Sequence, residues 1–132
     1  MNATRSSVIV AAAAAHVFGA IWYITLSGHW IAASGVASDA SGKPLNKSKV
    51  PFVISAIALI IVAGMMRHVF AMAAIDTFSE GLVSGIGLGA FVVSPWIATN
   101  YAYADRPKAL TLIDGGYAVI GSAIIGAVLG LF

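Results

Sequence analysis

The stretch GLVSGIGLGAFVVSPWIATNYAY, residues 81–103, contains no Asp, Glu, Lys or Arg. As an α-helix it would extend about 34 Å at ~1.5 Å per residue. That length is enough to cross the hydrocarbon core of a bilayer, which is ~30 Å thick. We therefore interpret this segment as a membrane-spanning helix, and the remainder of the chain is organised around it.

Three further stretches have the same apolar character: residues 7–26, 51–75 and 107–132. The segments between the four stretches are rich in Gly, Pro, Asp and Ser, which is typical of turns. Pro51 stands at a favoured first helical position. The sequence thus predicts one all-α domain over residues 1–132, an integral membrane bundle of four transmembrane helices with short loops, the longest being a cytoplasmic loop at residues 31–50.

The composition excludes most other classes of protein. Hydrophobic residues make up 60% of the 132 residues, charged residues make up 9%, and the mean hydropathy is +0.95. A soluble domain carries about 25% charged residues, so a water-soluble monomer is excluded, and disorder requires low hydrophobicity. The chain has no cysteine, which excludes a disulfide scaffold and thiolate chemistry.

The distribution of basic residues predicts the orientation. Five of the seven lie in the first and third predicted loops, namely Lys43, Lys47, Lys49, Arg106 and Lys108, whereas Arg5 and Arg67 lie toward the opposite side. Because Lys and Arg accumulate in cytoplasmic loops, we expect both termini outside, in the periplasm, for a multi-pass protein of a bacterial inner membrane. Contact with anionic headgroups accounts for the net charge of +2 without a nucleic-acid partner.

Small residues recur at four-residue spacing in three of the predicted helices. They are Ala11, Ala15 and Gly19; Gly81, Gly85 and Gly89; and Ser122, Gly126 and Gly130. Such residues share one helix face and allow the close backbone approach that drives association of helices in lipid. The first interpretation is packing within one bundle, in the manner of GxxxG motifs. The alternative assigns one face, chiefly the glycine face of residues 81–103, to a neighbouring subunit.

Asp114 is the main candidate for a functional side chain. It lies seven residues into the fourth predicted helix, about 10 Å along its axis. An aspartate at that depth is costly unless it is paired, hydrogen-bonded or protonated, so we expect it to face the bundle. Thr111 and Tyr117 share its helix face and are candidate donors. Two interpretations stay open, an ion or proton site and a structural hydrogen-bond anchor.

His16 lies near the middle of the first predicted helix. It is interpreted as a hydrogen-bonded neutral imidazole, with two alternatives: a proton-relay partner for Asp114, or an axial ligand to a haem or pigment. No cofactor or metal is predicted. Tyr23, Asn100 and Asp114 all lie toward the cytoplasmic side of the midplane, and we expect them to form a connected polar cluster.

Two groups of residues carry a resemblance to a known family. The first comprises FGAIWY at residues 18–23 and GHW at 28–30; the second comprises NYAYADRP at 100–107 and IDGGY at 113–117. The chain resembles the bacterial integral membrane family DUF1761, a family of unknown function. The resemblance implies a four-span membrane protein without established chemistry. It draws attention to six positions, Trp22, Tyr23, Asn100, Arg106, Asp114 and Tyr117.

No motif of a known enzyme class is present, such as Gly-x-Ser-x-Gly, His-Glu-x-x-His or a phosphate loop that follows a strand, so we do not expect an enzyme. The sequence favours a structural or accessory subunit of a membrane assembly, either a homo-oligomer or a larger, energy-transducing complex. The alternative is a small proton-coupled transporter or channel, in which Asp114, His16 and a helix kink at Pro95 are the working parts.

Overall fold

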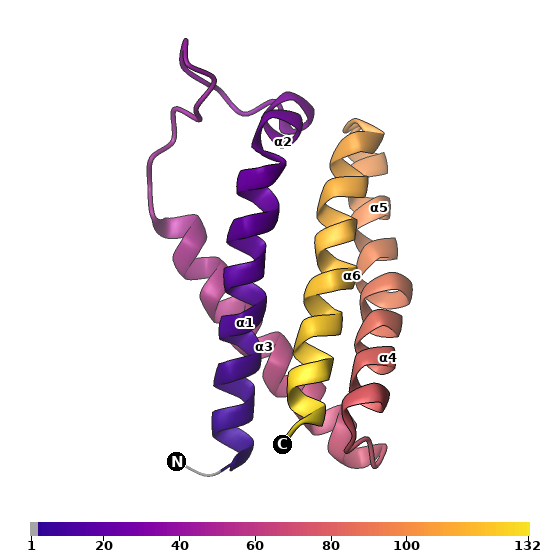
Figure 1. The fold of residues 1–132 in the computed structure, drawn as a ribbon. Coiled ribbons are helices and arrows are strands. Elements are labelled where there is room, and N and C mark those ends of the chain that lie inside the picture. The colour runs from indigo at the N-terminus through magenta and orange to yellow at the C-terminus, as the bar shows by residue number, and fades with distance from the viewer. Residues whose placement is uncertain (1–2) are drawn as a thin grey trace.

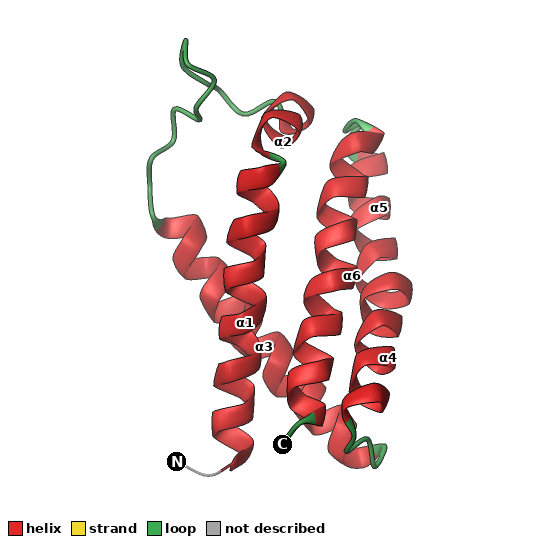
Figure 2. Cartoon of the chain, in the orientation of Figure 1, coloured by secondary structure: helices red, strands yellow, loops and turns green. Residues whose placement is uncertain are grey.

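The computed structural model describes residues 3–132, and the chain is helical over most of that range (Figures 1 and 2). Its elements are α1 (Ala3–Thr25), α2 (Ser27–Ser34), α3 (Val50–Met72), α4 (Phe78–Leu88), the π-helical segment η1 (Gly89–Val93), α5 (Ser94–Tyr103) and α6 (Lys108–Gly130). Four helices are long and apolar enough to cross a membrane: α1, α3, the continuous helix α4–η1–α5, and α6. The prediction of an all-α protein with four membrane-spanning helices is confirmed.

The spans alternate in direction, so the two ends of the bundle differ in content. One end carries both termini and the turn between α3 and α4, and we call it the terminal end (Figure 1). The other, the loop end, carries α2, the loop at residues 35–49 and the turn between α5 and α6. In Figure 1, α1, α6 and α4–η1–α5 stand side by side, whereas α3 is inclined across them. The helix α6 lies at the centre and packs against both α1 and α4–η1–α5.

The two helix boundaries at the turn between α3 and α4 differ from those expected from the sequence. Helix α3 ends at Met72 rather than at residue 75, because the chain reverses at Ala74, whose φ is 56°, and the Ile75 amide donates to the Phe70 carbonyl. This is the left-handed termination common at helix ends. The next helix begins earlier than residue 81, at Phe78, because the Thr77 side chain caps it by accepting from the Glu80 amide at 3.2 Å.

The expected loop at residues 31–50 is shorter in the structure. The short helix α2 occupies residues 27–34 and ends at Gly35, whose φ is 72°. Glycine adopts this left-handed conformation without steric cost. Beyond it, Asp39 organises a turn, since its Oδ1 accepts from the Ser41 hydroxyl at 2.6 Å, the Ser41 amide at 2.9 Å and the Lys43 amide at 3.0 Å. These bonds, above all the one from the Ser41 hydroxyl, lower the pKa of the exposed Asp39 carboxyl.

The closest approach in the bundle joins α4 to α6 through glycine. A Cβ added to Gly81 would overlap the carbonyl oxygen of Gly126, and one added to Gly85 would overlap that of Ser122. At Gly89 an added Cβ would lie 2.6 Å from the Ala118 carbonyl oxygen. The glycine face of residues 81–89 is therefore occupied by α6 of the same chain. This contact leaves no room there for the neighbouring subunit of the alternative interpretation.

The helix α4–η1–α5 changes geometry before its proline. The widened π turn covers Gly89–Val93, and α5 begins after it at Ser94, directly before Pro95. A proline ring clashes with the carbonyl one turn earlier in an α-helix, and a π turn is a known way to disturb the regular ladder locally. The expected deviation at Pro95 thus takes the form of a π-helical turn.

A dry core fills the half of the bundle nearer the terminal end. It consists of buried side chains from α1, α3 and α6: Ala11, Ala12, Ala15, Ala63, Met66, Phe70, Ile125 and Leu129. The alanines of α1 let α3 and α6 approach closely, as small residues do in membrane bundles. Phe70 and Leu129 are fully buried. This core separates the terminal end from the polar groups described next.

Candidate functional site

The carboxylate of Asp114 receives hydrogen bonds from two other spans. The Tyr23 hydroxyl of α1 donates to Oδ1 at 2.6 Å, and the Tyr101 hydroxyl of α5 donates to Oδ2 at 2.5 Å. An ionised carboxylate only accepts hydrogen bonds, and one donor serves each of its oxygens. We call Tyr23, Tyr101 and Asp114 the carboxylate cluster. It links α1, α5 and α6 near the loop end.

The positions of the three residues along their helices explain why they meet. Tyr23 and Tyr101 lie in the last turns of α1 and α5, and Asp114 lies in the second turn of α6. Because α6 runs opposite to the other two helices, an early position in α6 is level with late positions in α1 and α5. A phenol is long enough to bridge the distance between adjacent helix axes, which is ~8–10 Å.

Aromatic rings surround the Tyr23 side of the cluster. The Tyr23 ring makes an edge contact with Tyr117, at 5.5 Å between centroids and 73° between planes, and another with Trp30, at 6.3 Å and 86°. Edge-to-face pairs of this kind are favourable. They restrict rotation of the Tyr23 ring and so hold its hydroxyl against Asp114.

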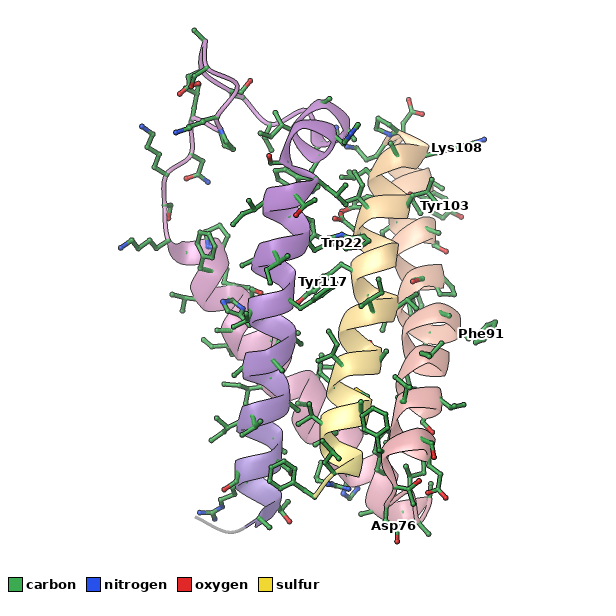
Figure 3. All side chains as sticks on the ribbon, viewed as in Figure 1. Trp22, Asp76, Phe91, Tyr103, Lys108 and Tyr117 are labelled. Atoms are coloured by element: carbon green, nitrogen blue, oxygen red, sulfur yellow. The ribbon has the colours of Figure 1, made fainter. Side chains whose placement is uncertain are left out.

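Trp22 and Tyr117 connect α1 and α6 in a reciprocal way. Trp22 of α1 donates through Nε1 to the Ile113 carbonyl of α6 at 3.0 Å, and Tyr117 of α6 donates through its hydroxyl to the Ala15 carbonyl of α1 at 2.8 Å. Figure 3 shows both side chains in the space between the two helices. A Cβ added to Gly19 would lie 2.7 Å from the Tyr117 hydroxyl oxygen, so the absence of a side chain at Gly19 makes room for Tyr117.

Arg106 occupies the loop end, outside the carboxylate cluster. Its guanidinium lies against Gly35 and points a donor at the Ala33 carbonyl, 3.5 Å away, in the last turn of α2. A cation at a helix C-terminus interacts favourably with the helix dipole. Arg106 therefore ties α2 to the turn between α5 and α6.

The side chain of His16 contacts α3 rather than Asp114, and the proton relay between the two residues remains a prediction. Its Nδ1 lies 3.4 Å from the Ser55 hydroxyl of α3 instead. Tyr117, a candidate donor to Asp114, points toward α1 and bonds the Ala15 carbonyl. Among residues 3–132, no group of three His, Asp or Glu side chains is placed to hold a metal ion.

Asn100 lies apart from the carboxylate cluster, on an exposed face of α5. The contact with Asp114 that was expected of Asn100 is made by its neighbour Tyr101, because successive helical residues are about 100° apart around the axis. The sequence alone does not single out Tyr101. An aromatic residue near the end of a span is ordinarily an interfacial anchor, and only its spacing from Asp114 in the folded bundle distinguishes it.

The four spans, and a carboxylate held between three of them, define a polytopic α-helical integral membrane protein. The chain belongs to the family DUF1761, described as a protein family of unknown function, which it matches over residues 6–130. No curated protein and no solved structure matches the chain.

Proposed function

We propose that the protein is a structural, accessory subunit of an assembly in the bacterial inner membrane and that α3 carries the contact with its neighbour, a second copy of this chain. The main support is that the other helices of the chain cover only a small part of α3. Only 11% of the most apolar stretch of α3 is buried, against 50% for α6. Helix α3 packs on α1, makes few contacts with α6, and leaves the bundle toward its first turn (Figure 1).

The exposed surface of α3 has the spacing of a helix–helix seam. Ile54, Ile57, Ile61 and Met65 are all exposed and follow one another at intervals of three or four residues. That spacing places them on one face, and β-branched residues in such a stripe suit packing against a like helix. A symmetric dimer would bring two copies of this stripe together.

The location of the polar groups favours a structural role for the carboxylate cluster. Tyr23, Tyr101 and Asp114 satisfy one another near the loop end, and the apolar core around Phe70 and Leu129 lies between them and the terminal end. A path for ions through one chain would need polar groups within that core, and the members of the core are apolar side chains. The proposal therefore includes neither catalysis nor transport by the single subunit.

The orientation is part of the proposal. The basic residues at 43–49 and 106–108 share the loop end of the bundle (Figure 1), which supports a cytoplasmic loop end and external termini by the positive-inside rule. Labelling of single cysteines at Ser41 and at Phe132 with a membrane-impermeant maleimide on intact cells tests this. Only Phe132→Cys should react before the membrane is permeabilised.

Disulfide crosslinking tests the α3 contact directly, because the chain has no cysteine of its own. In native membranes, Ile57→Cys and Ile61→Cys should give dimers on mild oxidation, since a disulfide needs Cα atoms within about 7 Å. Phe91→Cys, on the exposed side of η1, is the matched control and should stay monomeric. Equal crosslinking at all three sites, or only monomers in native mass spectrometry of bilayer discs, would contradict the α3 dimer.

A proton-coupled transporter or channel is the second candidate, and the observation that favours it is Asp114 itself. A carboxylate within a span, with phenol hydroxyls on both oxygens, is a group that can take up and release a proton. Proteoliposomes that contain a pH-sensitive dye test the idea with the wild type and Asp114→Asn. Proton flux in the wild type that is lost in Asp114→Asn supports transport; tight vesicles in both cases exclude this candidate.

A further inference from the structure

A second polar site lies at the opposite end of the molecule from the carboxylate cluster. A cleft of about 540 Å³ opens between α1 and α3 at the terminal end, a volume typical of small-molecule sites. Its rim carries Arg5, Arg67 and His68, and its inner wall includes Val8, Ile9 and Gly64. Among residues 3–132, no acidic side chain lines it. The cleft is thus basic at its mouth and apolar within.

The polar and apolar parts of the cleft are ordered by depth. Arg5 is in the first turn of α1, and Arg67 and His68 are near the end of α3, so these side chains lie toward the membrane surface. Val8 and Gly64 are each one turn further in. A phospholipid has the same order, with its phosphate at the surface and its acyl chains below.

Arg67 is held in place at the mouth of this cleft. Its Nη1 donates to the Leu129 carbonyl of α6 at 3.0 Å, which fixes the guanidinium without neutralising it. It forms no ion pair with Asp76 or Glu80, the acidic residues at the same end, within residues 3–132. A guanidinium has five N–H donors and matches the geometry of phosphate oxygens, so an anchored arginine can bind a phosphate with its other donors.

Gly64 provides the space for an acyl chain. A Cβ added at Gly64 would meet nothing within 4 Å, so no side chain of the bundle fills the groove beside it. Val8 and Ile9 of α1 line the cleft together with Gly64 of α3. Hydrocarbon is the natural occupant of such a surface at this depth.

We propose that this cleft binds one anionic glycerophospholipid, with its phosphate at Arg5, Arg67 and His68 and an acyl chain over Gly64. Basic pockets between transmembrane helices are suited to anionic headgroups. The cleft is formed by α1 and α3 of one chain. Gly64 lies two turns from Ile57 on the same face of α3, so the lipid and a second copy would occupy adjacent parts of one surface.

Lipid retention by the full-length protein tests the proposal. The protein is purified in mild detergent, phosphatidylglycerol or phosphatidylcholine is added, and native mass spectrometry counts bound lipid. We expect one retained phosphatidylglycerol per chain and at least about fivefold weaker retention of phosphatidylcholine, because one arginine contact near the surface is worth ~1 kcal/mol. Arg67→Gln should weaken phosphatidylglycerol binding by a similar factor, whereas Lys47→Gln, a charge removed at the loop end, should not.

A second variant keeps the test informative if Arg67→Gln fails to fold. Gly64→Leu fills the groove without changing the charge and should abolish retention, while Gly87→Leu, at another helical glycine with open space beside it, should retain the lipid. Three results would overturn the proposal. They are equal retention of both lipids, unchanged retention in Gly64→Leu, and binding of glycerol 3-phosphate alone as strong as that of phosphatidylglycerol.

Discussion

Tyr23 and Asp114 are 91 positions apart in the sequence, and the Tyr23 hydroxyl lies 2.6 Å from the Asp114 carboxylate. With Tyr101 on the other carboxylate oxygen, this contact makes one acidic side chain the meeting point of three spans. The first span therefore depends on the last for its polar partner, and the stability of the bundle should respond to changes at either residue.

Asp114→Asn should destabilise the protein by about 1–3 kcal/mol, because the amide keeps one acceptor oxygen and the second phenol then faces an NH2 group, which cannot accept a hydrogen bond. Thermal unfolding in detergent, or unfolding by titration with SDS, measures the change. Tyr23→Phe should have a smaller effect of the same sign. In the double variant the two effects should be less than additive, since both remove the same contact; full additivity would show that the contact does not contribute.

Gly85→Ala should destabilise the bundle by about 1–3 kcal/mol or more, because the new Cβ overlaps the Ser122 carbonyl of α6 and forces the helices apart. Gly87→Ala is the matched control on the same helix, with open space beside it. It should be neutral or stabilising by up to ~1 kcal/mol, because alanine is the better helix former. SDS titration of both variants measures the difference, and equal stability of the two would contradict the close approach of α4 and α6.

Gly19→Ala should destabilise the packing of α1 on α6 through its clash with Tyr117, whose hydroxyl oxygen is the nearest atom at 2.7 Å. Tyr117→Phe removes that oxygen together with its bond to the Ala15 carbonyl and should cost roughly 0.5–2 kcal/mol on its own. The double variant should be more stable than the sum of the two single effects predicts. A strictly additive double variant would show that the hydroxyl oxygen is not the source of the clash, which would then fall to the ring carbon Cζ, 2.9 Å from the added Cβ.

The turn at Asp39 should depend on pH in the acid range. Its pKa is lowered in the folded loop, chiefly by the Ser41 hydroxyl, so the turn is favoured above the ordinary value of 3.8 and is lost as pH falls through the lowered pKa. The chemical shift of the Ser41 amide in micelles, followed by NMR, reports the titration. Ser41→Ala should move the midpoint upward, and an unchanged midpoint would show that the hydroxyl is not the cause.

The four spans could be predicted because each is defined by its own local composition. Charge-free length alone identifies residues 81–103 as a span, and no knowledge of the neighbours is required. The same local reasoning missed α2 in part and the early start of α4 at Phe78, since these boundaries depend on a left-handed Gly35 and on the Thr77 cap. One is a backbone conformation and the other a side-chain cap, and composition specifies neither.

The partners of the polar side chains could be predicted only in part. The depth of Asp114 along its helix follows from counting residues, and so does its approximate level with Tyr23. The choice of Tyr101 over Asn100 depends on the rotation of α5 about its axis, which its packing on α6 determines. The same limit applies to His16, because the sequence gives its depth but not that it faces α3 and Ser55.

The link between Tyr23 and Asp114 also constrains the order of events during synthesis. The amino-terminal segment leaves the ribosome long before Asp114 has been translated. Until then, the hydroxyl of Tyr23 and the indole N–H of Trp22 need other hydrogen-bond partners. Water supplies these partners, because both side chains lie near the headgroups, where water reaches. Assembly can thus wait for the final segment without leaving unpaired polar groups in the hydrocarbon.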